Sequence, residues 1–271
     1  MSDRIGERFS GNKAKGVGSL LPYFTAGFPD METAADLIRT ADSAGATVIE
    51  IGEPYSDSIA DGPVIQDSFQ YALDHGHRTE KTIEMIAALR PQVSAGLVSM
   101  ISYTLVDRFG LDGYLTAAAQ AGLDGVIFPD LPIEESAPIA GAVRSAGLHY
   151  VGLISPTTAP LRAEAIARMS AGFVYQVADI GTTGERAHVH QGLPDRVAAL
   201  RRCTDLPICV GFGVASSAQV REVCRWADGA IVGSAIVRRI ADGLRSGAES
   251  GRIVKQVHSF LAELMTGLSN A

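Results

Sequence analysis

Eight short apolar runs that alternate with amphipathic stretches predict an α/β fold, a (β/α)8 TIM barrel with an extra N-terminal helix. The runs are apolar throughout, as expected for parallel strands that are buried on both faces. A chain of 271 residues also has the length that eight such units require. A doubly wound open sheet is the alternative, but it usually carries a glycine-rich fingerprint after its first strand. Residues 26–30, AGFPD, do not form that motif, so we favour the barrel.

The expected strands follow one another with a helical pattern between each pair. They cover residues 20–25, 47–51, 96–103, 125–129, 150–154, 172–177, 207–211 and 229–233. Two helices are additional to this repeat. Residues 3–12 precede the first strand and are expected to cap the barrel floor, and residues 252–266 are expected to complete the outer ring. No linker or low-complexity segment divides the chain, so we expect one domain over residues 1–271.

Four connections share a small residue followed by glycine, just before a strand. The glycines are Gly45, Gly122, Gly147 and Gly172. Glycine after a helix accepts the left-handed conformation that reverses the chain. The repeated turn therefore supports a series of equivalent helix-to-strand units.

Composition excludes several function classes. The net charge of −7 argues against a nucleic-acid footprint or an anionic membrane surface. No apolar run approaches the roughly 20 residues that span a bilayer, and the first residues lack a signal-peptide centre. Cys203, Cys209 and Cys224 share no metal-binding spacing and are expected to pack in the core. A cytoplasmic protein is the simplest interpretation.

Two carboxylates flank the loop after the second strand. Glu50 lies within an apolar strand, where a carboxylate is costly unless it is paired, neutral or used. Asp61 lies in a more polar loop, before Gly62 and Pro63. A buried structural acid is the alternative for Glu50, but two acids in different surroundings favour acid–base catalysis.

Glycines after the sixth, seventh and eighth strands predict a phosphate site. They belong to the segments GTTG at 181–184, GFG at 211–213 and GSAIV at 233–237, the last of which opens a helix. Loops after the last strands of a barrel commonly bind phosphate through backbone N–H groups and a helix N-terminus. Tight turns alone are the alternative for any one segment.

The polar loop over residues 181–192 is expected to act as a mobile lid. Its His188 and His190 have no evident third ligand, so we expect no metal and no other cofactor. Asp130 is either a helix cap or a site residue. These features together predict a barrel that acts on a phosphorylated small molecule with two carboxylates.

Motifs along the whole chain resemble the tryptophan synthase alpha subunit family. They are PYFTAGFPD at 22–30, IEIG at 49–52, SDSIADGPVIQ at 56–66, FPDLP at 128–132, SPTT at 155–158, GFVY at 172–175, GFGV at 211–214 and VGSAIV at 232–237.

The resemblance implies retro-aldol cleavage of indole-3-glycerol phosphate to indole and glyceraldehyde 3-phosphate. It implies Glu50 as the proton shuttle and Asp61 as the acceptor of the indole N–H. It implies Phe24 and Tyr175 on the indole side of the pocket. The phosphate would be held by Thr183, Gly184, Gly213, Gly233 and Ser234. It also implies a tryptophan synthase beta subunit as partner, in an α2β2 tetramer.

The chain departs from the family pattern in the lid and in the segments that face the partner. Ala178 and Asp179 replace a usual Ser-Arg pair, and Thr182 replaces a usual valine. Glu53 and Ser58 replace an apolar residue and a proline, and the segment around Thr104 lacks the usual asparagine. Two alternatives follow: a free-standing lyase, or a weakly catalytic chain that mainly activates a beta subunit.

Overall fold

The computed structural model describes residues 3–58, 61–178, 192–211 and 213–268. Its strands are β1 (Ser19–Thr25), β2 (Val48–Gly52), β3 (Gly96–Met100), β4 (Gly125–Ile127), β5 (His149–Tyr150), β6 (Leu153–Ile154), β7 (Val174–Val177), β8 (Ile208–Gly211) and β9 (Gly229–Val232). Its helices are α1 (Arg4–Ala14), α2 (Met31–Ala44), α3 (Pro63–Asp74), α4 (Thr79–Leu89), η1 (Arg90–Gln92), α5 (Tyr103–Phe109), α6 (Leu111–Ala121), α7 (Ile133–Ser145), α8 (Pro160–Met169), α9 (Leu193–Arg201), α10 (Ser217–Cys224), α11 (Ser234–Arg245) and α12 (Ser250–Met265).

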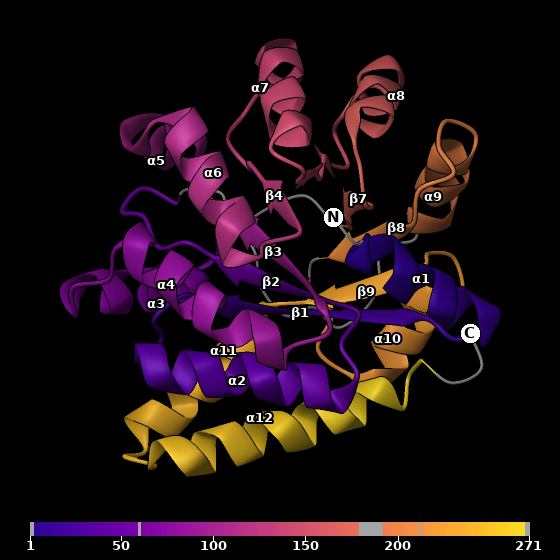
Figure 1. Cartoon of the computed structure of the whole chain (residues 1–271). Helices are drawn as coiled ribbons and strands as arrows, with labels where there is room; N and C mark the ends of the chain where they lie inside the picture. The colour runs from indigo at the N-terminus through magenta and orange to yellow at the C-terminus, as the bar shows by residue number, and fades with distance from the viewer. Residues whose placement is uncertain (1–2, 59–60, 179–191, 212, 269–271) are drawn as a thin grey trace.

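The strands form one parallel sheet with helices outside it (Figure 1). Their order is β5-β4-β3-β2-β1-β9-β8-β7-β6. The two ends of that order, β5 and β6, are halves of one extended segment that is interrupted at Val151 and Gly152. Val151 N–H still donates to Val126 O on one side, and Gly152 O accepts from Tyr175 N–H on the other, both at 3.0 Å. The sheet is therefore closed, and the predicted barrel is confirmed.

Alternation along each strand separates an inner from an outer core. Leu21, Val48, Val98, Tyr175 and Cys209 belong to the inner cluster. The intervening side chains pack against the helices in the larger outer cluster. Both faces of the sheet are thus buried, which explains why the strands are apolar throughout.

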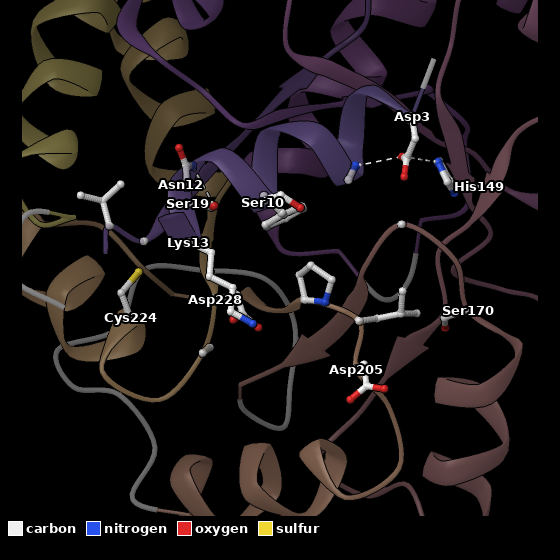
Figure 2. Close-up of a pocket in the computed structure, with 18 of the residues that line it drawn as sticks. Asp3, Ser10, Asn12, Lys13, Ser19, His149, Ser170, Asp205, Cys224 and Asp228 are labelled. Atoms are coloured by element: carbon white, nitrogen blue, oxygen red, sulfur yellow. Dashed lines mark hydrogen bonds and ion pairs between the residues drawn. The ribbon is translucent and has the colours of Figure 1, made fainter. Parts of the chain in front are cut away.

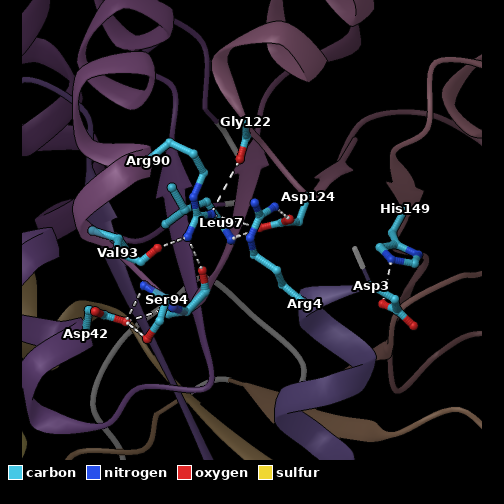
Figure 3. Close-up of polar contacts among 11 residues, drawn as sticks. Asp3, Arg4, Asp42, Arg90, Val93, Ser94, Leu97, Gly122, Asp124 and His149 are labelled. Carbon is cyan, nitrogen blue, oxygen red and sulfur yellow. Dashed lines mark hydrogen bonds and ion pairs between the residues drawn. The ribbon is translucent and has the colours of Figure 1, made fainter. Parts of the chain in front are cut away.

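Helix α1 closes the floor of the barrel, as the sequence predicts. Its Ile5 and Phe9 are buried in the inner cluster, and Phe9 contacts Phe173 with ring centroids 6.0 Å apart. Arg4 donates to Asp124 Oδ1 at 2.9 Å, and Arg90 donates to Asp124 Oδ2 at 3.0 Å (Figure 3). The helix is therefore joined to the sheet by both packing and charge.

All eight predicted strands are present, with differences at their ends. The third is shorter than the predicted 96–103, since β3 ends at Met100 and α5 begins at Tyr103. The four predicted turn glycines all have positive φ, between 76° and 102°. The last predicted helix is α12, which runs from Ser250 to Met265. Within the described residues, no helix has both the length and the apolar character needed to cross a membrane.

Candidate active site

Glu50 is the central carboxylate of the site. It lies on β2 in the same orientation as Val48 of the inner cluster, so its side chain points into the barrel. It is fully buried, and neither of its carboxylate oxygens has a hydrogen-bond partner among the described residues. Burial raises the pKa of Glu50 to about 8. At neutral pH the side chain is therefore mostly protonated and can donate a proton inside the barrel.

Asp61 is the second carboxylate, in the loop between β2 and α3. Its backbone N–H donates to Ser58 O at 3.0 Å, and its carbonyl accepts from Gln66 Nε2 at 2.9 Å. Burial raises the pKa of Asp61 to about 6, so the loop is less polar than the sequence suggests. The value remains below that of Glu50. Near pH 7 the two acids therefore adopt different protonation states, as acid–base catalysis requires.

Two tyrosines lie beside the acids on the inner side of the barrel. Tyr23 of β1 pairs in register with Glu50, and its hydroxyl occupies the space that a side chain at Gly52 would need. Tyr175 of β7 similarly has its hydroxyl against Gly211. Burial raises the pKa of both tyrosines, and the charges of Glu50 and Asp61 raise it further.

The structure does not bring Phe24 to this group. Phe24 is adjacent to Tyr23 on β1, so its side chain points to the opposite side of the strand, away from the acids. Tyr23 takes the position beside the acids that the sequence analysis gave to Phe24. Strand alternation accounts for this. Tyr23 is two residues from Leu21, so both side chains point to the inner side of the strand, on which Leu21 packs in the inner cluster.

The predicted phosphate side lies on the other side of β1. Strand β9 pairs with β1, and Gly233 follows it as the N-cap of α11, which begins at Ser234. A Cβ at Gly233 would lie 3.5 Å from Tyr23 Cβ, so this helix end adjoins the tyrosine that also touches Gly52. The first N–H groups of a helix have no partner within it and attract anions.

Gly213 has φ of 80°, a backbone conformation that favours glycine, and it follows β8 on the same edge of the sheet. Thr183 and Gly184, with the expected lid and His188 and His190, lie outside the described residues. The described residues contain no group of three side chains that could hold a metal ion.

A cavity of about 630 Å³ lies at the opposite end of the barrel, beside α1 (Figure 2). Lys13, His149 and Asp228 are among its lining residues, together with the N-terminal ends of several strands. Residues at this end of a barrel usually serve stability, whereas chemistry takes place at the other end.

Comparison with known proteins agrees with this geometry. The family model of the tryptophan synthase alpha chain matches residues 9–266. The tryptophan synthase alpha chain of Thermosynechococcus vestitus is 43% identical over 250 residues, covering 91% of this chain and 94% of that one. That of Rhodopirellula baltica is 42% identical and covers 86% and 85%. A structure of Mycobacterium tuberculosis tryptophan synthase matches with a TM-score of 0.90 at 31% identity, over 100% of both chains.

The chain belongs to the tryptophan synthase alpha chain family. As a member of that family it is a carbon–carbon lyase of tryptophan biosynthesis, and its reaction is the cleavage of indole-3-glycerol phosphate.

Asp130 has a structural role in this alpha chain. Its Oδ2 accepts from Ser102 Oγ at 2.6 Å, and its Oδ1 accepts from Tyr103 N–H at 2.7 Å. It therefore supports the start of α5, whereas the helix that follows it, α7, has Pro132 as its N-cap and no side-chain cap, so Asp130 does not cap that helix. Thr104 N–H donates to Ser102 Oγ at 3.2 Å and belongs to the same cap.

The two departures in the loop after β2 are both buried. Glu53 pairs with His77, a residue that the sequence analysis did not identify, with Oε2 and Nε2 3.1 Å apart. Ser58 is 4% exposed, and its carbonyl accepts from Asp61 N–H and from Gln66 Nε2. Ser58 therefore contributes directly to the structure that holds Asp61. Cys209 and Cys224 are buried, in agreement with the expected packing role, whereas Cys203 is only partly buried.

Proposed function

We propose that Glu50 moves the proton in the cleavage of indole-3-glycerol phosphate. Its protonated carboxyl group donates to C3 of the indole ring, because the indole carbanion is a poor leaving group. The resulting carboxylate then accepts the proton of the side-chain hydroxyl next to C3. The carbon–carbon bond breaks, its electrons return to the ring, and the hydroxyl becomes the aldehyde of glyceraldehyde 3-phosphate. Glu50 ends protonated, so one residue completes the cycle.

Asp61 stabilises the charge that this step creates. Protonation at C3 places positive charge on the indole nitrogen, and a carboxylate that accepts the N–H lowers the energy of that state. Asp61 suits this role because its pKa of about 6 leaves it ionised at neutral pH.

The substrate lies across β1, with indole near the acids and phosphate at the edge formed after β8 and β9. Tyr175 and Tyr23 line the indole side, and Tyr23 replaces Phe24 in this proposal. Gly213, Gly233 and Ser234 hold the phosphate, together with Thr183 and Gly184. The observation that carries this assignment is that Glu50 is buried without a hydrogen-bond partner among the described residues, on a strand that only β1 separates from β9.

Replacement of Glu50 tests the assignment. Glu50→Gln keeps the shape and removes the proton, so we expect the rate of indole formation to fall by at least about a hundredfold, within the range for general acid–base groups. The far-ultraviolet circular dichroism spectrum should be unchanged. Glu263→Gln, on the exposed side of α12, is the control and should retain full activity. Near-normal turnover by Glu50→Gln would overturn the proposed role.

The chain is further proposed to act as one barrel domain in the cytoplasm, as the alpha subunit of an α2β2 complex with a tryptophan synthase beta subunit. Several matching structures are described as tryptophan synthase rather than as the isolated alpha subunit, which supports this partnership. Indole release should be measured with the chain alone and after addition of a beta subunit. Activity that requires the beta subunit supports the complex. Full activity alone would favour the free-standing lyase, and none in either case would favour a chain that mainly activates its partner.

A further inference from the structure

A buried acid–histidine pair lies outside the barrel wall, directly behind the catalytic loop. Glu53 follows β2 on its outward side, the side on which Ile49 and Ile51 pack in the outer cluster. Its Oε2 lies 3.1 Å from Nε2 of His77, and each side chain is only 2% exposed. A pair of this kind is costly to bury, so its geometry has to be well satisfied to persist.

The second ring nitrogen fixes the way in which the pair is bonded. His77 Nδ1 is buried and has no hydrogen-bond partner in the described part of the chain. An N–H at Nδ1 would be left without an acceptor, which is unfavourable in a buried site. The imidazole therefore carries its proton on Nε2 and donates it to Glu53, while Thr82 Oγ1 lies 3.4 Å from the same nitrogen.

The histidine connects three segments near the catalytic edge. It lies in the turn between α3 and α4. Its Nδ1 faces Gly27, where a Cβ would come within 2.8 Å, so it also packs on the turn after β1. Glu53 is held in turn by its own N–H, which donates to Met100 O at 2.9 Å.

Asp61 lies between the two ends that the pair joins. The chain leaves β2 at Gly52, passes Glu53, reaches Asp61 and enters α3 at Pro63, and His77 follows the end of α3. The Glu53–His77 contact thus closes a loop of structure that contains Asp61. A change at the pair alters the direction in which the loop leaves β2 and the position of the helix that follows Asp61.

We propose that Glu53 and His77 form a positioning pair that sets the orientation of Asp61 toward the indole ring. The pair touches neither substrate nor reacting atoms. The proposal rests on the role of Asp61 proposed above. It also gives a function to Glu53, which replaces the apolar residue usual in the family.

Apolar replacement of both partners separates positioning from stability. Glu53→Leu or His77→Leu alone leaves one polar partner buried and should lower the melting temperature. The double variant E53L/H77L removes both polar groups and should recover most of that loss. Its kcat for indole-3-glycerol phosphate cleavage, measured with saturating beta subunit, should nevertheless stay about tenfold below wild type, because small displacements of a reacting group are sufficient for such losses.

The effect should also depend on Asp61. In an Asp61→Asn background, E53L/H77L should change kcat less than about twofold, because the residue that it positions has already been disabled. A tenfold loss in both backgrounds, or wild-type kcat in a double variant of restored stability, would overturn the proposal. If Asp61→Asn alone leaves kcat unchanged, the role of Asp61 is what fails.

A second acid–histidine pair, more exposed than the first, supplies the control. Asp3 and His149 are also 3.1 Å apart, but they lie at the barrel floor (Figure 3). The variant D3L/H149L should leave kcat at the wild-type level, and a loss like that of E53L/H77L would contradict a local effect on Asp61. Should E53L/H77L fail to fold, Glu53→Gln keeps the shape and weakens the contact. Glu53→Gln should lower kcat with little change in KM. An unchanged kcat in this variant would equally reject the positioning role of the pair.

Discussion

At the scale of single residues, the two proposed catalytic acids, Glu50 and Asp61, are distinguished by their surroundings and not by their chemical type. Glu50 has no hydrogen-bond partner among the described residues and a pKa of about 8, whereas the pKa of Asp61 is about 6. Only between about pH 6 and about pH 8 is Glu50 mostly protonated while Asp61 is mostly ionised. That window includes neutral pH.

The pH dependence of cleavage follows directly. kcat/KM should rise with pH through about 6 as Asp61 ionises and fall through about 8 as Glu50 loses its proton. A profile of initial rates between pH 5 and 9.5 checks both limbs. A profile that keeps rising above pH 9 would exclude Glu50 as the proton donor.

The same burial makes Glu50 a source of instability. Its pKa rises from an ordinary 4.5 to about 8, so the folded state binds more protons than the unfolded state between these values. Wild-type stability therefore falls as pH rises through that interval, while Glu50→Gln does not titrate. The variant should exceed wild type in free energy of unfolding by about 4.5 kcal/mol at pH 8.5, and the difference should vanish below pH 4.5. Urea titrations at several pH values measure it.

Substitutions at neighbouring positions on β1 should have different consequences. Tyr23→Leu removes a ring beside the acids and should raise KM for indole-3-glycerol phosphate several-fold. Phe24→Leu, on the helix side, should lower the free energy of unfolding by about 1 kcal/mol and leave KM unchanged. Steady-state kinetics and thermal melts of both variants make the comparison. A raised KM for Phe24→Leu alone would restore the original assignment.

At the scale of elements, Asp124 is one of the groups that attach α1 to the sheet, beside the packing of Ile5 and Phe9. Asp124 accepts from Arg4 and Arg90, and its Oδ2 also accepts from Leu97 N–H at 2.8 Å. Its side chain is 5% exposed and that of Arg90 is 10% exposed. Ion pairs this deeply buried are strongly destabilising to break.

Asp124→Asn should therefore lower the free energy of unfolding by about 3 kcal/mol, since it leaves Arg90 without its counter-charge. Asp124 lies at the end of the barrel opposite Glu50 and Asp61, so kcat/KM should remain within about twofold of wild type. Asp242→Asn is the matched control, because Asp242 also pairs with an arginine but is exposed. Its loss should stay below about 0.5 kcal/mol. Equal losses of free energy of unfolding in the two variants would show that the buried ion pairs of Asp124 matter no more than an exposed pair.

The strands and the acids could be predicted from sequence because both depend on local patterns. Continuous apolar runs mark strands that are buried on both faces, and Glu50 is conspicuous within one of them. The pairing of Glu53 with His77 could not be predicted in the same way. It depends on where α3 ends and on how closely its turn approaches Gly27, which only the tertiary structure shows.

At the scale of the whole molecule, the fold brings two residues that are distant in sequence, Glu50 and Ser234, to the two sides of one strand. Strand β1 pairs with β2 on one side and with β9 on the other. Glu50 and Ser234, separated by most of the chain, consequently lie on either side of one strand. Closure of the barrel is what brings Glu50 and the start of α11 to the same end of the fold, as the proposed substrate position requires.

Binding of a phosphate ester should therefore stabilise the whole barrel. Glycerol 3-phosphate at about 100 times its Kd should add roughly 2.7 kcal/mol to the free energy of unfolding, visible as a higher melting temperature. Ser234→Asp places a negative charge at the start of α11, where it suits the helix dipole and repels the ligand. The variant should remain folded and lose the shift. Ser250→Asp, the same change at the first position of α12, should keep the shift. An equal shift in both variants would place the anion away from α11.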